Sequence, residues 1–240
     1  MNETISATRT VTPPAGRSAP RKSGGWTRLQ IATHVAALVP LAWLLWDAWN
    51  GDLTANPIQE VTFRTGRTAL RLLVLSLAIT PANTLFGWRR LIPLRRALGL
   101  YAFCYGFLHF LTFVVLDYGL DPVLLQEAIL KKKYALVGFS AFLILLPLAI
   151  TSTKGWQKRL GKRWKQIHKL AYLAAALVIV HFTWLVKADI TRPIAYGIAV
   201  ALLLTLRLPA VRQAVTRWRS AKSRRRPTIS AATRRGESST

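Results

Sequence analysis

Cysteine, methionine and acidic residues are scarce in this chain of 240 residues, which contains one Cys, one Met and nine Asp+Glu. A single cysteine, Cys104, excludes an intramolecular disulfide and a thiolate-bound metal cluster. It lies in an apolar run, where we expect a small packing residue. The sequence also lacks a P-loop and a GxGxxG motif, and the connections between its apolar runs are short. We therefore expect no soluble nucleotide-binding domain.

Basic and apolar residues are both abundant. The 34 Lys and Arg give a formal net charge of +25, whereas 52% of the residues are hydrophobic. A strongly basic chain suggests nucleic-acid binding, and a strongly apolar chain suggests a membrane protein. The position of the charges decides between them, because charges confined between long apolar blocks indicate charged loops that connect membrane-spanning segments.

Six long apolar blocks follow one another along the chain. Each approaches the roughly 20 residues that a helix needs to cross a hydrocarbon core of about 30 Å. Segments that span lipid must satisfy their own backbone groups, which predicts helices. The fold class is therefore all-α, a polytopic membrane bundle of six transmembrane helices. The blocks are Leu29–Trp49, Ala69–Trp88, Ala97–Leu116, Tyr134–Thr151, Ile167–Val186 and Pro193–Leu208.

The basic residues collect on one side of this bundle. If the six blocks alternate in direction, 25 of the 34 basic residues and two of the nine acidic residues share the side of the N-terminal arm. The other side carries six basic and seven acidic residues, with Lys131–Lys133 as a local exception. By the positive-inside rule, both termini are expected in the cytoplasm.

Two basic segments flank the predicted transmembrane domain of residues 29–208. Residues 1–28 are rich in Thr, Ser, Ala and Pro, and we expect a disordered arm there. Residues 209–240 form a second basic segment, which we expect to be a disordered tail that is attracted to anionic lipid. A nucleic-acid-binding tail is disfavoured because no recognition motif is present.

All four histidines lie inside apolar blocks, where ionisable residues are costly and therefore candidates for function. Neutral imidazole is a good ligand for haem iron. His109 lies about 12 residues, or roughly 18 Å, into its helix, and His181 about 14 residues, or roughly 21 Å. This similar depth predicts that the two could face each other across one haem. His34 and His168 lie near the cytoplasmic ends and could serve a second haem or electron entry, or be core histidines.

Arg67 and Arg71 form an i, i+4 pair at the outer start of the second block. A planar guanidinium suits carboxylates, so haem propionates are candidate partners. The alternative is that both side chains snorkel to the outer surface.

Four motifs indicate a family. They are Thr65–Leu70 (TGRTAL), Arg96–Leu100 (RALGL), Thr151–Thr153 (TST) and Leu160–His168 (LGKRWKQIH), the last with His181 thirteen residues later. Together they resemble the MsrQ (YedZ) family, the haem-binding membrane subunits of the protein-methionine-sulfoxide reductase system. These subunits have ferric-reductase-like transmembrane domains. The resemblance covers roughly residues 29–208.

The resemblance implies a b-type haem, FMN as a second cofactor and a location in the bacterial inner membrane. It implies electron transfer from the quinol pool to a periplasmic molybdopterin-containing methionine sulfoxide reductase, for repair of oxidised proteins. The family's haem ligands carry over to His109 and His181, with His168 as a further family position. Related NADPH oxidases carry another histidine about 14 residues before the first of these, where this chain has Arg95. That inner ligand is missing unless His34 replaces it. No residue is assigned to a flavin or quinone.

Two other functions remain open. The same fold could reduce ferric iron or oxygen with electrons from a cytoplasmic flavin reductase. A small transporter with histidine proton relays is the alternative from another class. Relays usually include carboxylates within the membrane, and the only acidic residue in a block, Asp47, is counted at the outer end of the first.

Overall fold

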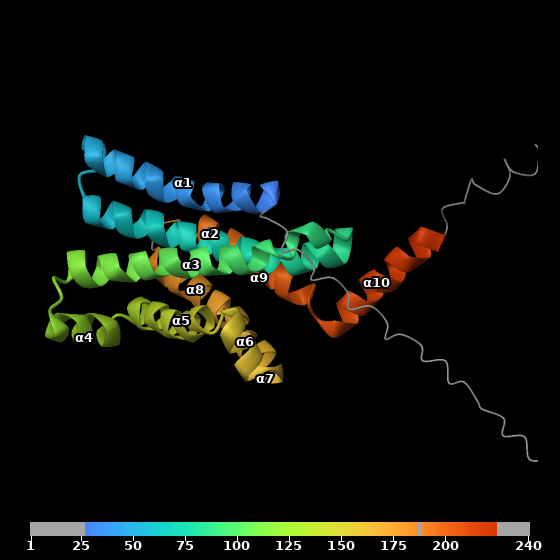
Figure 1. Cartoon of the computed structure of the whole chain (residues 1–240). Coiled ribbons are helices and arrows are strands. Elements are labelled where there is room, and N and C mark those ends of the chain that lie inside the picture. Colours follow the sequence, from blue (N-terminus) through green and yellow to red (C-terminus); the bar gives the residue numbers. More distant parts are fainter. Residues whose placement is uncertain (1–26, 187–188, 225–240) are drawn as a thin grey trace, which may run out of the picture.

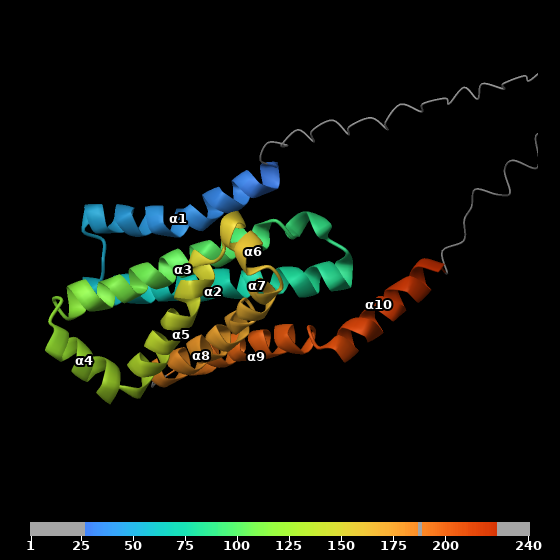
Figure 2. The ribbon, with the colours of Figure 1, turned by 60° about the horizontal axis from the view of Figure 1, so that its bottom comes forward.

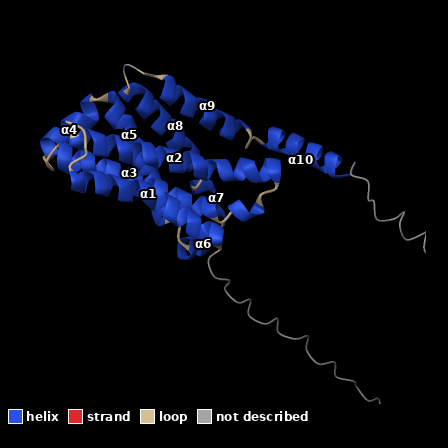
Figure 3. Cartoon of the chain, turned by 90° about the horizontal axis from the view of Figure 1, so that it is seen from above, coloured by secondary structure: helices blue, strands red, loops and turns tan. Residues whose placement is uncertain are grey.

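The computed structural model describes residues 27–186 and 189–224, and all regular structure in these ranges is helical (Figure 3). Five helical segments are long and apolar enough to cross a membrane, and a sixth arises if α9 (Thr191–Thr205) and α10 (Pro209–Arg224) form one bent span. The predicted all-α membrane bundle is confirmed. The five segments are α1 (Arg28–Asn50), α2 (Pro57–Phe86), α3 (Leu94–Leu111) with the π-helical turn η2 (Thr112–Asp117), α5 (Lys133–Ile150), and α7 (Lys162–Ile167) with α8 (Leu170–Leu185).

The helices run up and down between two ends. The α1–α2 connection and α4 (Pro122–Lys131) lie at one end, which we call the Thr54 end (Figure 1). The opposite Trp88 end carries η1 (Arg89–Leu91) and α6 (Lys154–Leu160). Helix α1 covers α2 and α3 on one side, and α8 and α9 lie on the other (Figures 1 and 2). The most extensive pairings are α2 on α3 and α5 on α8.

Small and apolar side chains hold the helices together. The central core joins α1, α2, α3, α8 and α9, with Ala102 2% and Ala175 0% exposed. Large apolar side chains instead cover the exterior, and on α1 Trp43, Leu45 and Trp46 are 62–67% exposed. A bundle that is apolar outside as well as inside suits a lipid environment, where packing of small residues joins the helices.

Helix α2 begins at Pro57, twelve residues before the predicted block at Ala69. Its first turn is capped by Asn56, whose side chain accepts a hydrogen bond from the Gln59 amide, and proline is favoured at this position. The apolar block is shorter than helix α2, because the charged residues in the first turns of α2 form ion pairs and so are tolerated within the helix. Arg67 and Arg71 consequently lie three to four turns inside a 30-residue helix rather than at its outer start.

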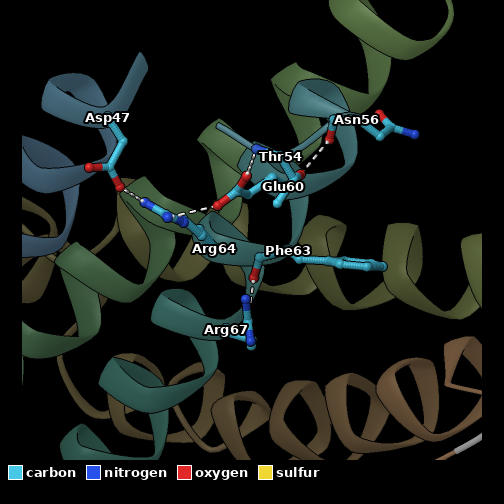
Figure 4. Close-up of polar contacts among 7 residues, drawn as sticks. All are labelled: Asp47, Thr54, Asn56, Glu60, Phe63, Arg64 and Arg67. Carbon is cyan, nitrogen blue, oxygen red and sulfur yellow. Dashed lines mark hydrogen bonds and ion pairs between the residues drawn. The ribbon is translucent and has the colours of Figure 1, made fainter. Parts of the chain in front are cut away.

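The charges near the Thr54 end form an ion-pair network (Figure 4). Arg64 on α2 pairs with Asp47 on α1 and with Glu60, 2.7 Å away on the preceding turn. Glu60 also accepts a hydrogen bond from the Thr54 amide. Glu60 and Arg64 lie within α2, where the sequence predicted a loop between the first two apolar blocks, and the network joins the ends of α1 and α2.

Two further differences from the sequence prediction lie at the Trp88 end. His168 follows the last residue of α7 and precedes α8, so it lies at a break between helices. In the segment 209–240, where we predicted a tail without regular structure, the structure has helix α10 up to Arg224, bent by 67° from α9. Residues 1–26 of the predicted arm 1–28 and residues 225–240 of the predicted tail lie outside the described residues.

Tyr105 pairs with the backbone of α1 next to Pro40. Its hydroxyl accepts a hydrogen bond from the Leu41 amide (3.0 Å) and donates one to the Ala37 carbonyl (2.8 Å). A side chain is thereby inserted into the backbone ladder of α1, a known cause of helix kinks. Tyr105 is 3% exposed, so its hydroxyl has no access to bulk solvent.

Replacing Tyr105 by Phe should lower the free energy of unfolding by about 1–3 kcal/mol, because two buried backbone groups lose a partner. Unfolding in mixed micelles measures this change. Tyr118→Phe is the matched control, because that hydroxyl accepts from the exposed Lys132, and we expect a change within about 0.5 kcal/mol. Equal effects of the two substitutions would contradict the role assigned to Tyr105.

Candidate functional site

His109 on α3 and His181 on α8 lie opposite each other near the Thr54 end. Their ring centres are 6.1 Å apart and their planes make an angle of 78°. Two imidazole–metal bonds of about 2 Å each leave ring centres roughly 6 Å apart when an ion lies between them. The structure thus brings together the two histidines that share a predicted depth, at a separation that suits two ligands of one metal.

Both rings are oriented by backbone carbonyls of a neighbouring helix. Nδ1 of His109 lies 2.8 Å from the Thr62 carbonyl oxygen on α2, and Nδ1 of His181 lies 2.7 Å from the Tyr134 carbonyl oxygen on α5. A carbonyl only accepts, so each Nδ1 carries the proton and donates. The Nε2 lone pair of each ring then remains available for a metal, and such outer contacts typically fix ligand tautomers.

A cavity of about 540 Å³ surrounds the pair. Its walls are mostly apolar and aromatic, and Phe110 and Phe142 stack with ring centres 4.7 Å apart. This size and lining are typical of a site for a largely apolar cofactor. Among the described residues, no three His, Cys, Asp or Glu side chains gather to hold a metal ion. Two histidines in an apolar cavity therefore suit a metal whose other ligands come from a cofactor.

Arg67 lines the cavity, whereas its predicted companion Arg71 is exposed and outside the lining. Nε of Arg67 donates to the Phe63 carbonyl (3.2 Å), and the side chain extends away from the Arg64 network (Figure 4). Three arginines lie near Arg67, with Arg192 of α9 acting on it most strongly, and Tyr196 of α9 is also close. A half-buried cation among cations suits an anionic ligand, because isolated charges in a membrane are costly.

The opening of the cavity has fixed charges. Lys132 donates to the Tyr118 hydroxyl (2.7 Å), and this hydrogen bond raises the pKa of the lysine. Asp189 accepts from the Thr191 amide (3.0 Å), and its hydrogen bonds with Thr191 lower the pKa of that carboxylate. Both shifts favour the charged forms, so the two groups stay ionised around neutral pH.

The other two histidines contact different partners. Nδ1 of His34 lies 3.0 Å from the Tyr101 hydroxyl, and the rings meet edge to face. Nε2 of His168 lies 3.2 Å from the Thr151 hydroxyl, and its ring lies 4.1 Å from that of Trp164. Their proposed roles in a second haem or in electron entry remain predictions.

Sequence reasoning missed four features of the site: the Thr62 and Tyr134 carbonyls, the close approach of two glycines to the rings, and Arg192. Gly66 and Gly138 each lie one helical turn after the residue that provides the carbonyl. The equal spacing from carbonyl to histidine, 47 residues in both cases, is a signal that a search for internal repeats could find.

Comparison with known proteins bears on this site. The family described as ferric reductase like transmembrane component matches residues 65–179, which include His109 and end just before His181. The chain is 45% identical over 181 residues to a relative from Xanthomonas euvesicatoria pv. vesicatoria, and the match covers 73% of this chain and 83% of that relative. A relative from Herminiimonas arsenicoxydans is also 45% identical, over 76% of this chain and 85% of its own length.

A third relative, from Xanthomonas campestris pv. campestris, is 44% identical over 78% of this chain and 89% of its own length. All three are named protein-methionine-sulfoxide reductase heme-binding subunit MsrQ. Identity at this level over most of both chains extends well beyond any single motif. The chain belongs to the MsrQ family of membrane haem-binding subunits, whose transmembrane domain is of the ferric reductase type.

Proposed function

We propose that this protein is a b-type cytochrome subunit that passes electrons from quinol across the inner membrane to a periplasmic methionine sulfoxide reductase containing molybdopterin. The observation that carries the proposal is the His109–His181 pair, with ring centres 6.1 Å apart in an apolar cavity. The names of the relatives, which describe a haem-binding subunit of a methionine sulfoxide reductase system, support it. Repair of oxidised methionine needs reducing equivalents.

The residues of the cavity fit a haem. His109 and His181 would bind the iron through Nε2, since each Nδ1 is occupied by a carbonyl. Arg67 would pair with a propionate, and the nearby Arg192 adds positive charge. Arg71 is the less suitable of the two arginines that the sequence proposed as propionate contacts, because its residue is exposed. A bound haem supplies reversible one-electron chemistry at iron, which no side chain of the described residues provides.

We propose that the Thr54 end faces the periplasm. The Trp88 end carries the basic segments 89–96 and 154–165, which the positive-inside rule places in the cytoplasm. His109 and His181 both lie near the last turns of helices that run toward the Thr54 end. This orientation puts the pair close to the membrane surface at which a periplasmic partner would dock.

The cytoplasmic half of the bundle is the proposed side of electron entry. His34 and His168 lie there and are candidates for a second haem or for the entry site. FMN is proposed as a second cofactor from the family resemblance, without assigned residues. Quinol is proposed as the donor from the family resemblance, and the lack of a nucleotide-binding motif in the sequence means that a reductant must come from elsewhere.

The experiment that tests this function uses the full chain in sealed vesicles with its reductase partner outside. Quinol and methionine sulfoxide are added, and methionine formation is measured against vesicles without the subunit. We expect methionine formation that requires both proteins and quinol. Methionine formation only with a cytoplasmic flavin reductase would favour the alternative electron source, and reduction of ferric chelate in place of sulfoxide would favour a ferric reductase, as the matching family description suggests. A protein without haem that takes up solutes with protons would indicate the transporter.

Replacing Arg67 by Gln should weaken haem retention by about tenfold or more, because a hydrogen bond to a charged group contributes about 1.5–3 kcal/mol. Loss of a cation next to the cofactor should also lower its reduction potential. The matched control is Arg71→Gln, one turn further along α2 and exposed. Haem titration and potentiometry measure both effects. Equal behaviour of the two variants would refute a specific role for Arg67.

A further inference from the structure

His109 is held by a compact arrangement on α2. Its Nδ1 donates to the Thr62 carbonyl, and Gly66 lies one turn later on the same helix face. A Cβ atom on Gly66 would lie 3.0 Å from Nδ1 and 3.2 Å from Cε1 of His109. The imidazole therefore lies directly against the backbone of α2, and the missing side chain allows this approach.

His181 is held in the same way on α5. Its Nδ1 donates to the Tyr134 carbonyl, and Gly138 lies one turn later. A Cβ atom on Gly138 would lie 2.6 Å from Nδ1 and 2.8 Å from Cε1 of His181. A Cβ atom does not approach other atoms of a folded protein this closely, so this position is more restrictive than Gly66.

The two arrangements are related by a constant offset of 72 positions: 62 to 134, 66 to 138 and 109 to 181. Each uses a pair of extensively packed helices, α2 with α3 and α5 with α8. Further identical residues at this offset lie in the same helices, namely Ala69 and Ala141, Ala102 and Ala174, and Phe110 and Phe182. The same arrangement of carbonyl, glycine and histidine thus occurs twice, once in each helix pair, and we call it the duplicated unit.

We propose that Gly66 and Gly138 are positioning residues of this duplicated unit. Each glycine lets an imidazole reach the carbonyl one turn earlier, which places the proton on Nδ1, leaves Nε2 for the metal and sets the angle of 78° between the rings. This inference rests on the proposed ligation of haem iron by His109 and His181. It adds that the ligand geometry is set by two backbone surfaces rather than by side-chain partners.

Three alanine variants of the full-length protein test the proposal. The control is Gly155→Ala, because Gly155 is a helical glycine of α6 outside the cavity lining and a Cβ there meets nothing within 4 Å. Gly138→Ala should weaken haem retention by about 10- to 100-fold, the usual effect of losing outer-shell support of a metal ligand. Gly66→Ala should keep more haem, because a shift of a few tenths of an ångström relieves its contact.

Spectroscopy separates positioning from general destabilisation. In Gly66→Ala we expect a changed low-spin electron paramagnetic resonance signal and a shifted reduction potential, with both unchanged in Gly155→Ala. A double-mutant cycle of Gly138→Ala and His181→Ala, measured by thermal stability, provides an independent test. The thermal destabilisation caused by Gly138→Ala should largely vanish in the His181→Ala background, because removal of the imidazole makes room for the new Cβ.

The outcomes distinguish this proposal from the proposed function. If the wild-type protein binds no haem, the function is wrong, while the cycle still reports whether Gly138 and His181 are in contact. If haem binds but the Gly66, Gly138 and Gly155 variants behave alike, the glycine proposal is overturned and the function stands. The glycine proposal would also be overturned if Gly138→Ala destabilised the His181→Ala variant as much as it destabilises the wild-type protein.

Discussion

Alanine in place of either His109 or His181 should abolish haem binding at the outer site, with loss of its Soret and α bands. In the proposed site each ring would supply one nitrogen to the iron, so each single variant would lose a bond that the other ring cannot replace. The measurement is haem-to-protein stoichiometry with reduced-minus-oxidised spectra of the purified variants. Both variants should lose the same spectral component, because the two ligands serve one iron.

His34→Ala is the informative comparison, because its ring contacts Tyr101 on the opposite half of the bundle. Retention of the outer-site bands in this variant is expected. Added imidazole should partly restore the bands in His109→Ala and His181→Ala, since the cavity of about 540 Å³ can admit the missing ring. Unchanged bands in either ligand variant would show that the pair does not bind haem.

Arg64→Leu should destabilise the fold by about 3 kcal/mol, the lower part of the range for removing one member of a buried ion pair. The lower part applies because Arg64 is 32% exposed, whereas Asp47 and Glu60 are 12% and 13% exposed. Both carboxylates would remain at the α1–α2 junction without their cation. The free energy of unfolding in mixed micelles measures the loss, and Arg64→Lys should recover part of it.

A second ion pair provides the comparison for Arg64. Lys131 and Glu127 are 2.6 Å apart on α4, but their side chains are 74% and 52% exposed. Exposed pairs of this kind contribute about 0–1 kcal/mol, so Lys131→Leu should have little effect. If Arg64→Leu and Lys131→Leu destabilise the protein equally, the network does not join α1 to α2 in the way described.

The spans could be predicted from sequence, but their limits could not. A segment in lipid needs a long apolar helix, so the apolar blocks coincide with helices α1, α3 and α5 within a few residues. Helix α2 continues for twelve residues beyond its block, because Arg64 finds Asp47 and Glu60 as partners. Such pairing depends on the neighbouring helix and leaves no local pattern.

The candidate site could be predicted in part for a similar reason. Burial in the membrane singled out the histidines, and depth along the helices paired His109 with His181 correctly in space. The carbonyl contacts have no signature in the sequence, because every residue carries a carbonyl. Glycine is common in transmembrane helices, so Gly66 and Gly138 are conspicuous only once the rings are seen against them.

The most direct test of the central claim is electron paramagnetic resonance of the oxidised full-length protein and of its His109→Ala and His181→Ala variants. The two imidazole planes are 78° apart, so the account predicts a strongly anisotropic low-spin ferric signal that disappears in both variants. A low-spin signal that survives in either variant, or a wild-type protein without low-spin haem, would contradict it.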